Sequence, residues 1–404
     1  MTRRSERLWN IVKSKRLRVY IQVLFITLAV LWMFHEMGGR FYLPLSEPDE
    51  AAWIYSGYYF NLYFLKFDLF HKDWQDYDAY DHPPLVKYII GGTLFLKGYV
   101  FDSLDAKRMW HQIPMDQYLI YYGIMKSQLP ENVLPLTRLV IFFFAFLSVA
   151  LMYIFLRTFY GIWPAIAATS FLITNSTFIR LSTQTIADPV LLFFFTLFLL
   201  LTAHYLKSGK NIYIFLGFIL SSLALLTKLN GLILIFALCF VLVIKNKFSI
   251  SNYSGKLLIF GFGTFLLLTV LLNPFFLNSG IHGLVRMFDH RIAHLHFQQE
   301  TFAPAALLSI GERLKSEIVM IFFTSSLSYD LLKIPLEFMM FLLGVYYMVR
   351  KRDLILLTVL VFFVIPTMSI LPINWERYYC RVIPFICVTV GASLNIFKEL
   401  EKSV

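Results

Sequence analysis

The stretch Ser46-Glu47-Pro48-Asp49-Glu50 follows the first apolar run of the chain, and the interpretation of the whole sequence starts from it. Pro48 disfavours helix at Glu47 and is well suited to be the first residue of a new helix. Asp49 and Glu50 then lie in the first turn, where the helix dipole favours negative charge. Such a turn fits either a capped helix at a membrane interface or a pair of catalytic carboxylates. The stretch alone does not choose between them.

The composition around this stretch indicates an integral membrane protein. Of 404 residues, 58% are hydrophobic and only 15% are charged, with a mean hydropathy of +0.66. A soluble domain has about a quarter of its residues charged. Cys239, Cys380 and Cys387 lie in or beside apolar runs without disulfide or metal spacing, which is typical of small buried side chains.

The basic residues behind the net charge of +11 concentrate in the loops that are expected on the cytoplasmic side of the membrane. This distribution argues against a nucleic-acid partner. Residues 1–18 carry seven Lys and Arg against one Glu, so this end is expected to be cytoplasmic. The first apolar run, Val19–Phe34, has no cleavage site after it and reads as an anchor. Alternating inner and outer loops then give about ten spans with both termini cytoplasmic. The later spans are expected at Leu139–Leu156, Trp163–Phe178, Val190–Tyr205, Ile212–Leu226, Leu232–Ile244, Leu257–Phe276, Leu336–Val349, Leu354–Leu371 and Val382–Ile396.

Two long segments are expected on the extracytoplasmic side. Residues 35–135 hold 13 of the 25 acidic residues, and residues 277–333 form the second segment. The apolar run Leu85–Val100 is interpreted as a re-entrant or juxtamembrane helix, because counting it as a span would place Arg350-Lys351-Arg352 outside. The sequence therefore predicts an all-α polytopic membrane protein, with residues 1–404 as one domain, a plasma-membrane protein if prokaryotic.

Ionisable side chains at the outer ends of these spans form the candidate site, because polar groups at membrane depth are costly. The set is Asp49, Glu50, Asp81, His82, Arg138, Asp188, Lys228, Asn230, Arg377 and Tyr378. Singly, Lys228 or Arg377 could extend to the interface and Asp188 could cap a helix. Together on one side they suit sugar transfer from a lipid phosphate, which needs a carboxylate base and cations for the leaving phosphate.

The sequence resembles the GT-C membrane glycosyltransferases, and most of all the dolichyl-phosphate-mannose protein O-mannosyltransferases. Asp49-Glu50 after the first span resembles their acidic motif, and Asp81-His82-Pro83-Pro84-Leu85-Val86-Lys87 resembles their His-Pro-Pro-Leu-Gly-Lys segment, with Val86 in place of glycine. Further similar positions are Thr137-Arg138-Leu139, Ala187-Asp188-Pro189, Leu226-Thr227-Lys228-Leu229-Asn230-Gly231 and Arg377-Tyr378 with Pro384. The carbohydrate-binding insert of many eukaryotic relatives has no counterpart here.

The resemblance implies an inverting displacement on a polyprenyl-phosphate sugar, mannose or another hexose, carried by dolichol or undecaprenol. The acceptor would be a hydroxyl of a protein, lipid or glycan at the extracytoplasmic face. Asp49 would be the base, and Glu50 would orient donor or acceptor. Arg138, Lys228 and Arg377 would hold the phosphate, and Asp188 would orient these cations. The donor-binding set would be completed by His82, Lys87, Asn230 and Tyr378.

Alternatives remain open at this point. No cofactor is implied with certainty, but His290 and His294 are four residues apart and could share a helix face as ligands of a divalent metal. Their interleaving with Arg286 and Arg291 favours contact with phosphate or the membrane surface. Aminoarabinose-type lipid A transferases share the architecture and use another acceptor. A transporter would be expected to show paired repeats, which the sequence lacks, and a non-catalytic scaffold would not explain the clustered acids and bases.

Overall fold

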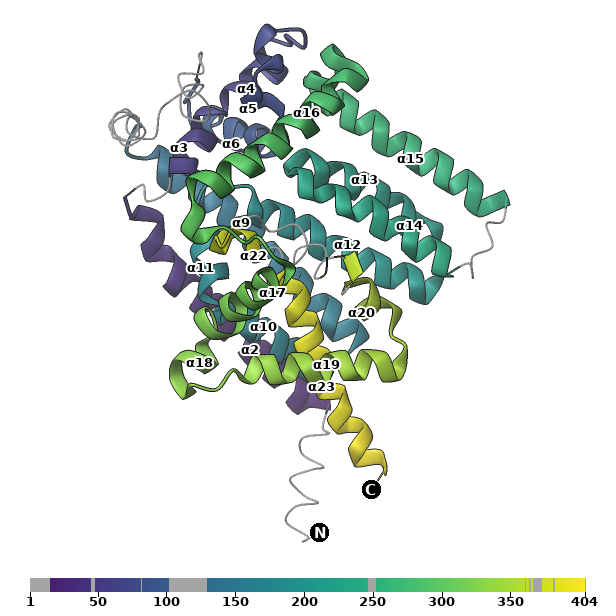
Figure 1. Ribbon diagram of the computed structural model, residues 1–404. Coiled ribbons are helices and arrows are strands. Elements are labelled where there is room, and N and C mark those ends of the chain that lie inside the picture. Colours follow the sequence, from purple (N-terminus) through teal and green to yellow (C-terminus); the bar gives the residue numbers. More distant parts are fainter. Residues whose placement is uncertain are drawn as a thin grey trace.

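A computed structural model describes residues 15–44, 48–80, 82–101, 129–245, 252–359, 361, 362, 365, 373–380 and 382–403. These residues are almost entirely helical, and the described part contains one isolated β-bridge, between Ala306 and Ile373 (Figure 1). The prediction of an all-α protein is confirmed. Ser46, Glu47, Asp81, Arg381 and residues 1–14, on which parts of the sequence interpretation rest, lie outside the described residues.

Within the described ranges, most neighbouring helices are joined by short connections. The segment up to residue 101 holds α2 (Lys15–Gly38), η1 (Gly39–Tyr42), α3 (Pro48–Tyr55), α4 (Tyr58–Phe60), η2 (Asn61–Leu65), η3 (Lys72–Gln75), α5 (Tyr77–Tyr80) and α6 (Leu85–Phe95). The middle of the chain holds α9 (Val133–Phe159), α10 (Ile162–Thr174), α11 (Ser176–Ser182), α12 (Asp188–Ser208), α13 (Asn211–Thr227), η4 (Leu229–Leu232), α14 (Ile233–Lys245) and α15 (Asn252–Leu272). The last part holds α16 (Pro274–Thr301), η5 (Ala303–Ala305), α17 (Ile310–Val319), η6 (Met320–Thr324), α18 (Leu327–Leu332), α19 (Leu336–Lys351), α20 (Leu354–Val359), α22 (Glu376–Cys380) and α23 (Ile383–Ser403).

Several of these helices suit a membrane, although fewer reach full length than the sequence predicts. In the described part, four helices are long and apolar enough to cross, and a bent pair makes a fifth. Four more apolar helices have only 10–17 residues. Some of the roughly ten expected spans therefore correspond to helices that are shorter than a full membrane crossing. Among them α6 has 11 residues, about 16 Å, and is too short for a ~30 Å hydrocarbon core, in agreement with its interpretation as juxtamembrane.

One predicted span is broken. Trp163–Phe178 was expected to be continuous, but α10 and α11 meet at an angle of 66°. Asn175 lies at the break in extended conformation, and its side-chain carbonyl accepts a hydrogen bond from the backbone N–H of Phe178. An Asn side chain that caps α11 in this way competes with continuation of α10. Because α11 runs on to Ser182, the outer loop expected at Arg180–Asp188 shrinks to residues 183–187.

The segment after α15 also differs from the sequence expectation. Residues 277–333 were expected to form the second extracytoplasmic segment, and much of this segment is one helix, α16, which extends from Pro274 to Thr301 with a kink at Gly280, where φ is +54°. Asn273 ends the preceding turn and caps α16, because its side chain accepts from the Phe275 N–H. The predicted span Leu257–Phe276 therefore ends at Leu272.

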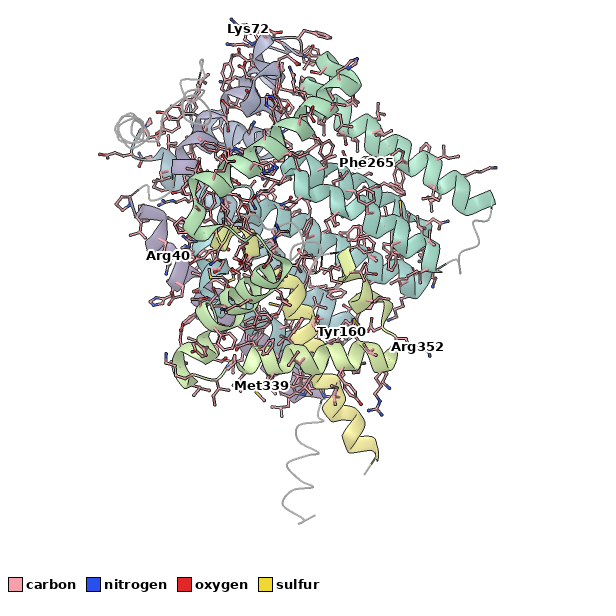
Figure 2. All side chains as sticks on the ribbon, viewed as in Figure 1. Arg40, Lys72, Tyr160, Phe265, Met339 and Arg352 are labelled. Atoms are coloured by element: carbon pink, nitrogen blue, oxygen red, sulfur yellow. The ribbon has the colours of Figure 1, made fainter. Side chains whose placement is uncertain are left out.

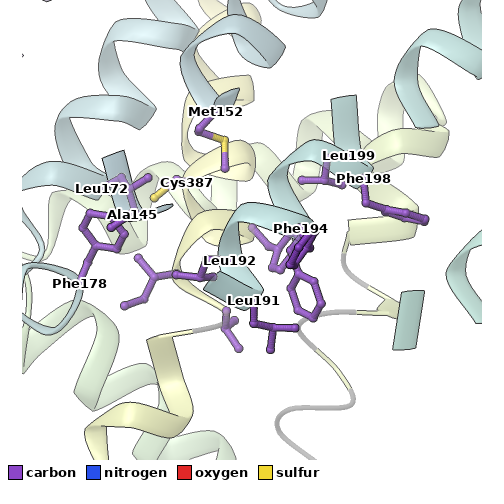
Figure 3. Packing of buried hydrophobic residues seen from close by; sticks show 14 of the residues in the cluster. Ala145, Met152, Leu172, Phe178, Leu191, Leu192, Phe194, Phe198, Leu199 and Cys387 are labelled. Atoms are coloured by element: carbon purple, nitrogen blue, oxygen red, sulfur yellow. The ribbon is translucent and has the colours of Figure 1, made fainter. Parts of the chain in front are cut away.

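The core is formed where α9, α10, α12 and α23 meet. Met152, Leu172, Phe198 and Cys387, one from each helix, are buried in the same cluster (Figure 3). In the most apolar stretch of α12, 67% of the residues are buried. The corresponding share in α15 is 17%, because α15 lies at the outer edge of the bundle (Figure 1). Between helices in lipid, packing rather than the hydrophobic effect drives association, so close approach matters. At Gly344 of α19, for example, an added Cβ would lie 2.1 Å from the Thr389 carbonyl oxygen of α23.

Basic helix ends gather at one end of the bundle. Lys207 at the end of α12 lies 5.7 Å from the Phe159 ring at the end of α9, and Lys245 at the end of α14 donates to the Leu206 carbonyl. The Tyr160 hydroxyl donates to Asp353 after α19 at 3.0 Å. Figure 2 shows Tyr160 and Arg352 in this half of the molecule and Lys72 at the opposite extremity. The predicted inner loops thus lie together.

Candidate active site

The first turn of α3 directs two neighbouring carboxylates into different surroundings. Pro48 begins the helix and Asp49 and Glu50 lie in its first turn, as the sequence predicts. Adjacent helical residues are rotated by about 100°. The Glu50 side chain is fully buried, whereas 20% of the Asp49 side chain is exposed. Only one of the two carboxylates is therefore accessible to a substrate.

Glu50 forms a closed ion pair with Arg138 near the start of α9. Arg138 Nε and Nη2 donate to the two Glu50 carboxylate oxygens at 2.8 and 2.6 Å, and the Thr185 backbone N–H donates to Glu50 at 2.8 Å. Arg138 also donates to the backbone carbonyls of Arg40, Phe41, Leu43 and Pro44. All three guanidinium nitrogens are engaged, and the arginine side chain is only 2% exposed. This pair joins α3, α9, the chain after α2 and the loop before α12.

Asp49 pairs instead with Arg377 of α22, 328 residues away in the sequence. The pair is partly open to solvent, with 28% of the Arg377 side chain exposed. The guanidinium lies over the Trp375 and Tyr378 rings, 4.6 and 5.5 Å from their centroids. The neighbouring Glu376 bonds Arg180 of α11 at 2.5 Å. Contacts of this kind hold α22 beside the first turn of α3.

A third ion pair joins the ends of α12 and α13. Lys228 Nζ donates to both Asp188 oxygens at 2.9 Å. Asp188 begins α12 ahead of Pro189, and Lys228 follows the last residue of α13 in extended conformation. An ammonium carries three N–H groups, so one stays available for a ligand. The loop before α12 connects this pair to the buried one, since Thr185 lies three residues before Asp188.

The turn after Lys228 is tight. A Cβ at Gly231 would lie 2.1 Å from the Ala224 carbonyl carbon, so the backbone of η4 packs directly on the last turns of α13. Asn230 lies half-buried in the same turn. The position of Lys228 therefore depends on a residue without a side chain.

Other predicted residues lie around this centre. The His82 ring lies tilted against Trp53 of α3, with the ring centroids 5.1 Å apart, and the Tyr378 hydroxyl donates to Gln298 of α16 at 3.4 Å. Lys87 is buried in a separate environment, where its ammonium donates to the Asp78 carbonyl and lies 4.6 Å from the centre of the Tyr59 ring.

The two histidines considered as metal ligands share α16, as expected from their spacing. His290 Nδ1 lies 2.7 Å from the Tyr80 hydroxyl, and the His294 ring stacks on Phe297. Within the described ranges no three His, Cys, Asp or Glu side chains are grouped to hold a metal ion.

Tyr379 connects its own helix, α22, to α17. Burial raises the pKa of Tyr379 to about 12, opposed by its hydrogen bond with Ser316, so the phenol keeps its proton at physiological pH. Its hydroxyl donates to Asn374 at 2.9 Å and lies 2.5 Å from the Ser316 hydroxyl of α17. These bonds fix the segment that carries Arg377.

No known family profile and no curated protein matches this sequence. Among solved structures, ArnT from Cupriavidus metallidurans superposes with a TM-score of 0.55 and 16% identity, both in the apo state and bound to undecaprenyl phosphate. This chain shares the fold of ArnT. The match covers 93% and 92% of this chain and 60% of each ArnT chain, so this chain spans about 60% of the length of those proteins. The archaeal oligosaccharyltransferase AglB from Archaeoglobus fulgidus, in complex with an inhibitory peptide and a dolichol-phosphate, gives a TM-score of 0.48 at 14% identity over 95% of this chain and 52% of that chain.

Sequence reasoning missed several residues around this candidate site. Trp375 adjoins the predicted Arg377, and its aromatic ring beside a cation was a readable signal. Arg180 and Glu376 are charged and flank apolar runs, which also could have drawn attention. Thr185 contributes through its backbone N–H, and no side-chain pattern reveals that.

Proposed function

We propose that this chain is a glycosyltransferase that moves a sugar from a polyprenyl-phosphate donor to an acceptor hydroxyl on the extracytoplasmic face. The observation that carries the proposal is the pairing of the accessible Asp49 with Arg377, at the same end of a GT-C fold as the Asp188–Lys228 pair. A base and cations for a phosphate are the groups that this reaction requires. The ArnT structure that contains undecaprenyl phosphate supports a polyprenyl-linked donor.

In the proposed reaction Asp49 accepts the proton of the acceptor hydroxyl. The acceptor oxygen bonds to the anomeric carbon while the bond from that carbon to the phosphate oxygen breaks. The electron pair leaves with the polyprenyl phosphate, whose charge Arg377 and Lys228 neutralise. A single displacement of this kind inverts the anomeric configuration.

The geometry favours revised roles for two residues that were expected to contact substrate. Arg138 has every guanidinium nitrogen engaged within the protein, and Glu50 is fully buried. We assign both to positioning the first turn of α3, and we leave the phosphate to Arg377 and Lys228. Asp188 would orient Lys228, while His82, Asn230 and Tyr378 would line the donor site. Lys87 would not contact the donor but would stabilise the packing of the first extracytoplasmic segment, residues 35–135.

The assignment of mannose or another hexose as the sugar, and of a protein as the acceptor, is based on the sequence motifs. A lipid acceptor, as in the aminoarabinose-type transferases, is the alternative within the enzyme class. Mass spectrometry of surface proteins and lipids from cells with and without the gene separates the two acceptors. A transporter would leave the labelled sugar without a covalent product.

Purified protein should transfer radiolabelled sugar from polyprenyl phosphate, and Asp49→Asn should lower the rate at least about 100-fold, because the amide cannot accept the proton. Exposed Asp330 provides the matched control, and Asp330→Asn should retain the wild-type rate. Near-normal turnover in folded Asp49→Asn would remove the assigned base.

A further inference from the structure

The two ion pairs at the start of α3 differ in how easily they can open. The Glu50–Arg138 pair has both side chains at 2% exposure or less and a full set of hydrogen bonds. The Asp49–Arg377 pair is 20% and 28% exposed, and among the described residues Arg377 hydrogen-bonds only to Asp49. Replacing one anion by another at Arg377 requires little change elsewhere, whereas Arg138 could release Glu50 only by leaving a buried charge unpaired.

The observed pair also conflicts with the reaction. A carboxylate engaged by a guanidinium is a poor proton acceptor, and a guanidinium engaged by a carboxylate is not available to a leaving phosphate. The donor phosphate is a diester, and its two non-bridging oxygens match the arginine fork as the two oxygens of a carboxylate do. A single exchange of partners resolves both conflicts.

We propose that Arg377 is an exchangeable partner of Asp49, and that the donor phosphate takes the guanidinium and so frees the carboxylate to act as the base. The donor then binds before the acceptor hydroxyl can be deprotonated. This inference rests on the proposed function and adds an order of events to it.

An aromatic platform keeps Arg377 within reach of both partners. The Trp375 and Tyr378 rings are parallel within 3°, and cation–π attraction to their faces does not depend on Asp49. Phe302, just after α16, packs edge-on against Trp375 at 5.0 Å. The Asn374 N–H donates to the Ala305 carbonyl at 2.8 Å. The guanidinium can therefore change its anion without losing its support.

The test is the affinity for undecaprenyl phosphate and dolichyl phosphate, measured in detergent without sugar and compared with the uncharged alcohols. Asp49→Asn removes the competing carboxylate and should bind the phosphates roughly threefold more tightly or better, the range set by a partly exposed ion pair. Asp330→Asn is the control. It removes one negative charge from an exposed position on α18 and leaves the Asp49–Arg377 pair intact, so its affinity should stay within about twofold of wild type.

Each other outcome overturns a defined statement. An unchanged or weaker affinity of folded Asp49→Asn contradicts the exchange, as does an equal gain in Asp330→Asn. A variant that fails to fold also contradicts it, because a pair that opens in each cycle cannot be required for folding. If wild type binds the phosphates no better than the alcohols, the proposed function itself fails. Phosphate binding without a gain in Asp49→Asn leaves that function standing.

Discussion

At the scale of single residues, two neighbouring acids have different partners and different burial. Glu50 and Arg138 form a buried bidentate pair that fixes the backbone, while Asp49 one position earlier faces Arg377 at a partly open surface. The motif predicts the two carboxylates but not which of them is buried, because burial depends on segments far away in the sequence. In particular, Arg138 donates to backbone carbonyls after α2. Every residue type has such a carbonyl, so the sequence does not reveal these bonds.

The buried pair should dominate stability at this site. Glu50→Gln leaves the Arg138 charge buried without its partner and should cost about 3–5 kcal/mol of unfolding free energy. Arg180→Gln breaks the Arg180–Glu376 pair, whose side chains are 38% and 41% exposed, and should cost less than about 1 kcal/mol. Thermal unfolding of both variants in detergent measures the difference. If they melt together, the anchoring role of Glu50 is wrong.

At the scale of elements, the side chains of the candidate site lie where helices begin or end. Asp188 begins α12, Lys228 follows α13, and Asp49 lies in the first turn of α3. Helix ends carry unpaired backbone groups, which attract polar side chains, and within a membrane such ends must be buried or lie at the surface.

Gly231 should be indispensable for the position of Lys228. Gly231→Ala would force its Cβ to 2.1 Å from the Ala224 carbonyl carbon, so the turn must shift. We expect a lower melting temperature and weaker polyprenyl phosphate binding. Gly263→Ala in α15 is the control, because its Cβ would meet nothing within 4 Å. That control should be neutral or slightly stabilising, since alanine favours helix by about 1 kcal/mol over glycine. Equal behaviour of the two variants would contradict this account of the turn.

Long apolar runs made most helices predictable, and the two main errors have physical causes. The break at Asn175 was missed because one polar residue hardly alters an apolar run, although its side chain decides the local backbone. The full length of helix α16 was not predicted because its histidines and arginines lower its hydropathy. Its exposed Val285, Phe288 and Ile292 recur at three- and four-residue spacing, which is the signature of an amphipathic helix.

At the scale of the whole molecule, the site lies opposite the basic helix ends. Lys207, Lys245 and Arg352 belong to one end, and the three acid–base pairs connect helix ends at the other. Sequence charge alone predicts this polarity, because lysines and arginines mark cytoplasmic loops. The partnership of residues 49 and 377 could not be predicted in this way, since it depends on how distant helices pack.

The orientation can be tested with introduced cysteines. In a variant without Cys239, Cys380 and Cys387, we expect Tyr42→Cys near the site to react with an impermeant thiol reagent on intact cells. Lys210→Cys at the basic end should react only after permeabilisation, because positive loops remain cytoplasmic. Both positions are exposed. The reverse pattern would invert the proposed topology.

The break between α10 and α11 has a consequence for biogenesis. Trp32 of α2 donates its indole N–H to the carbonyl of Ile173, in the last turn of α10, at 3.1 Å. An unpaired carbonyl in hydrocarbon costs several kcal/mol. Because α2 precedes α10 along the chain, this donor is synthesised before the interrupted helix that uses it. The first described helix thus supplies a hydrogen-bond donor that the break in a later helix requires.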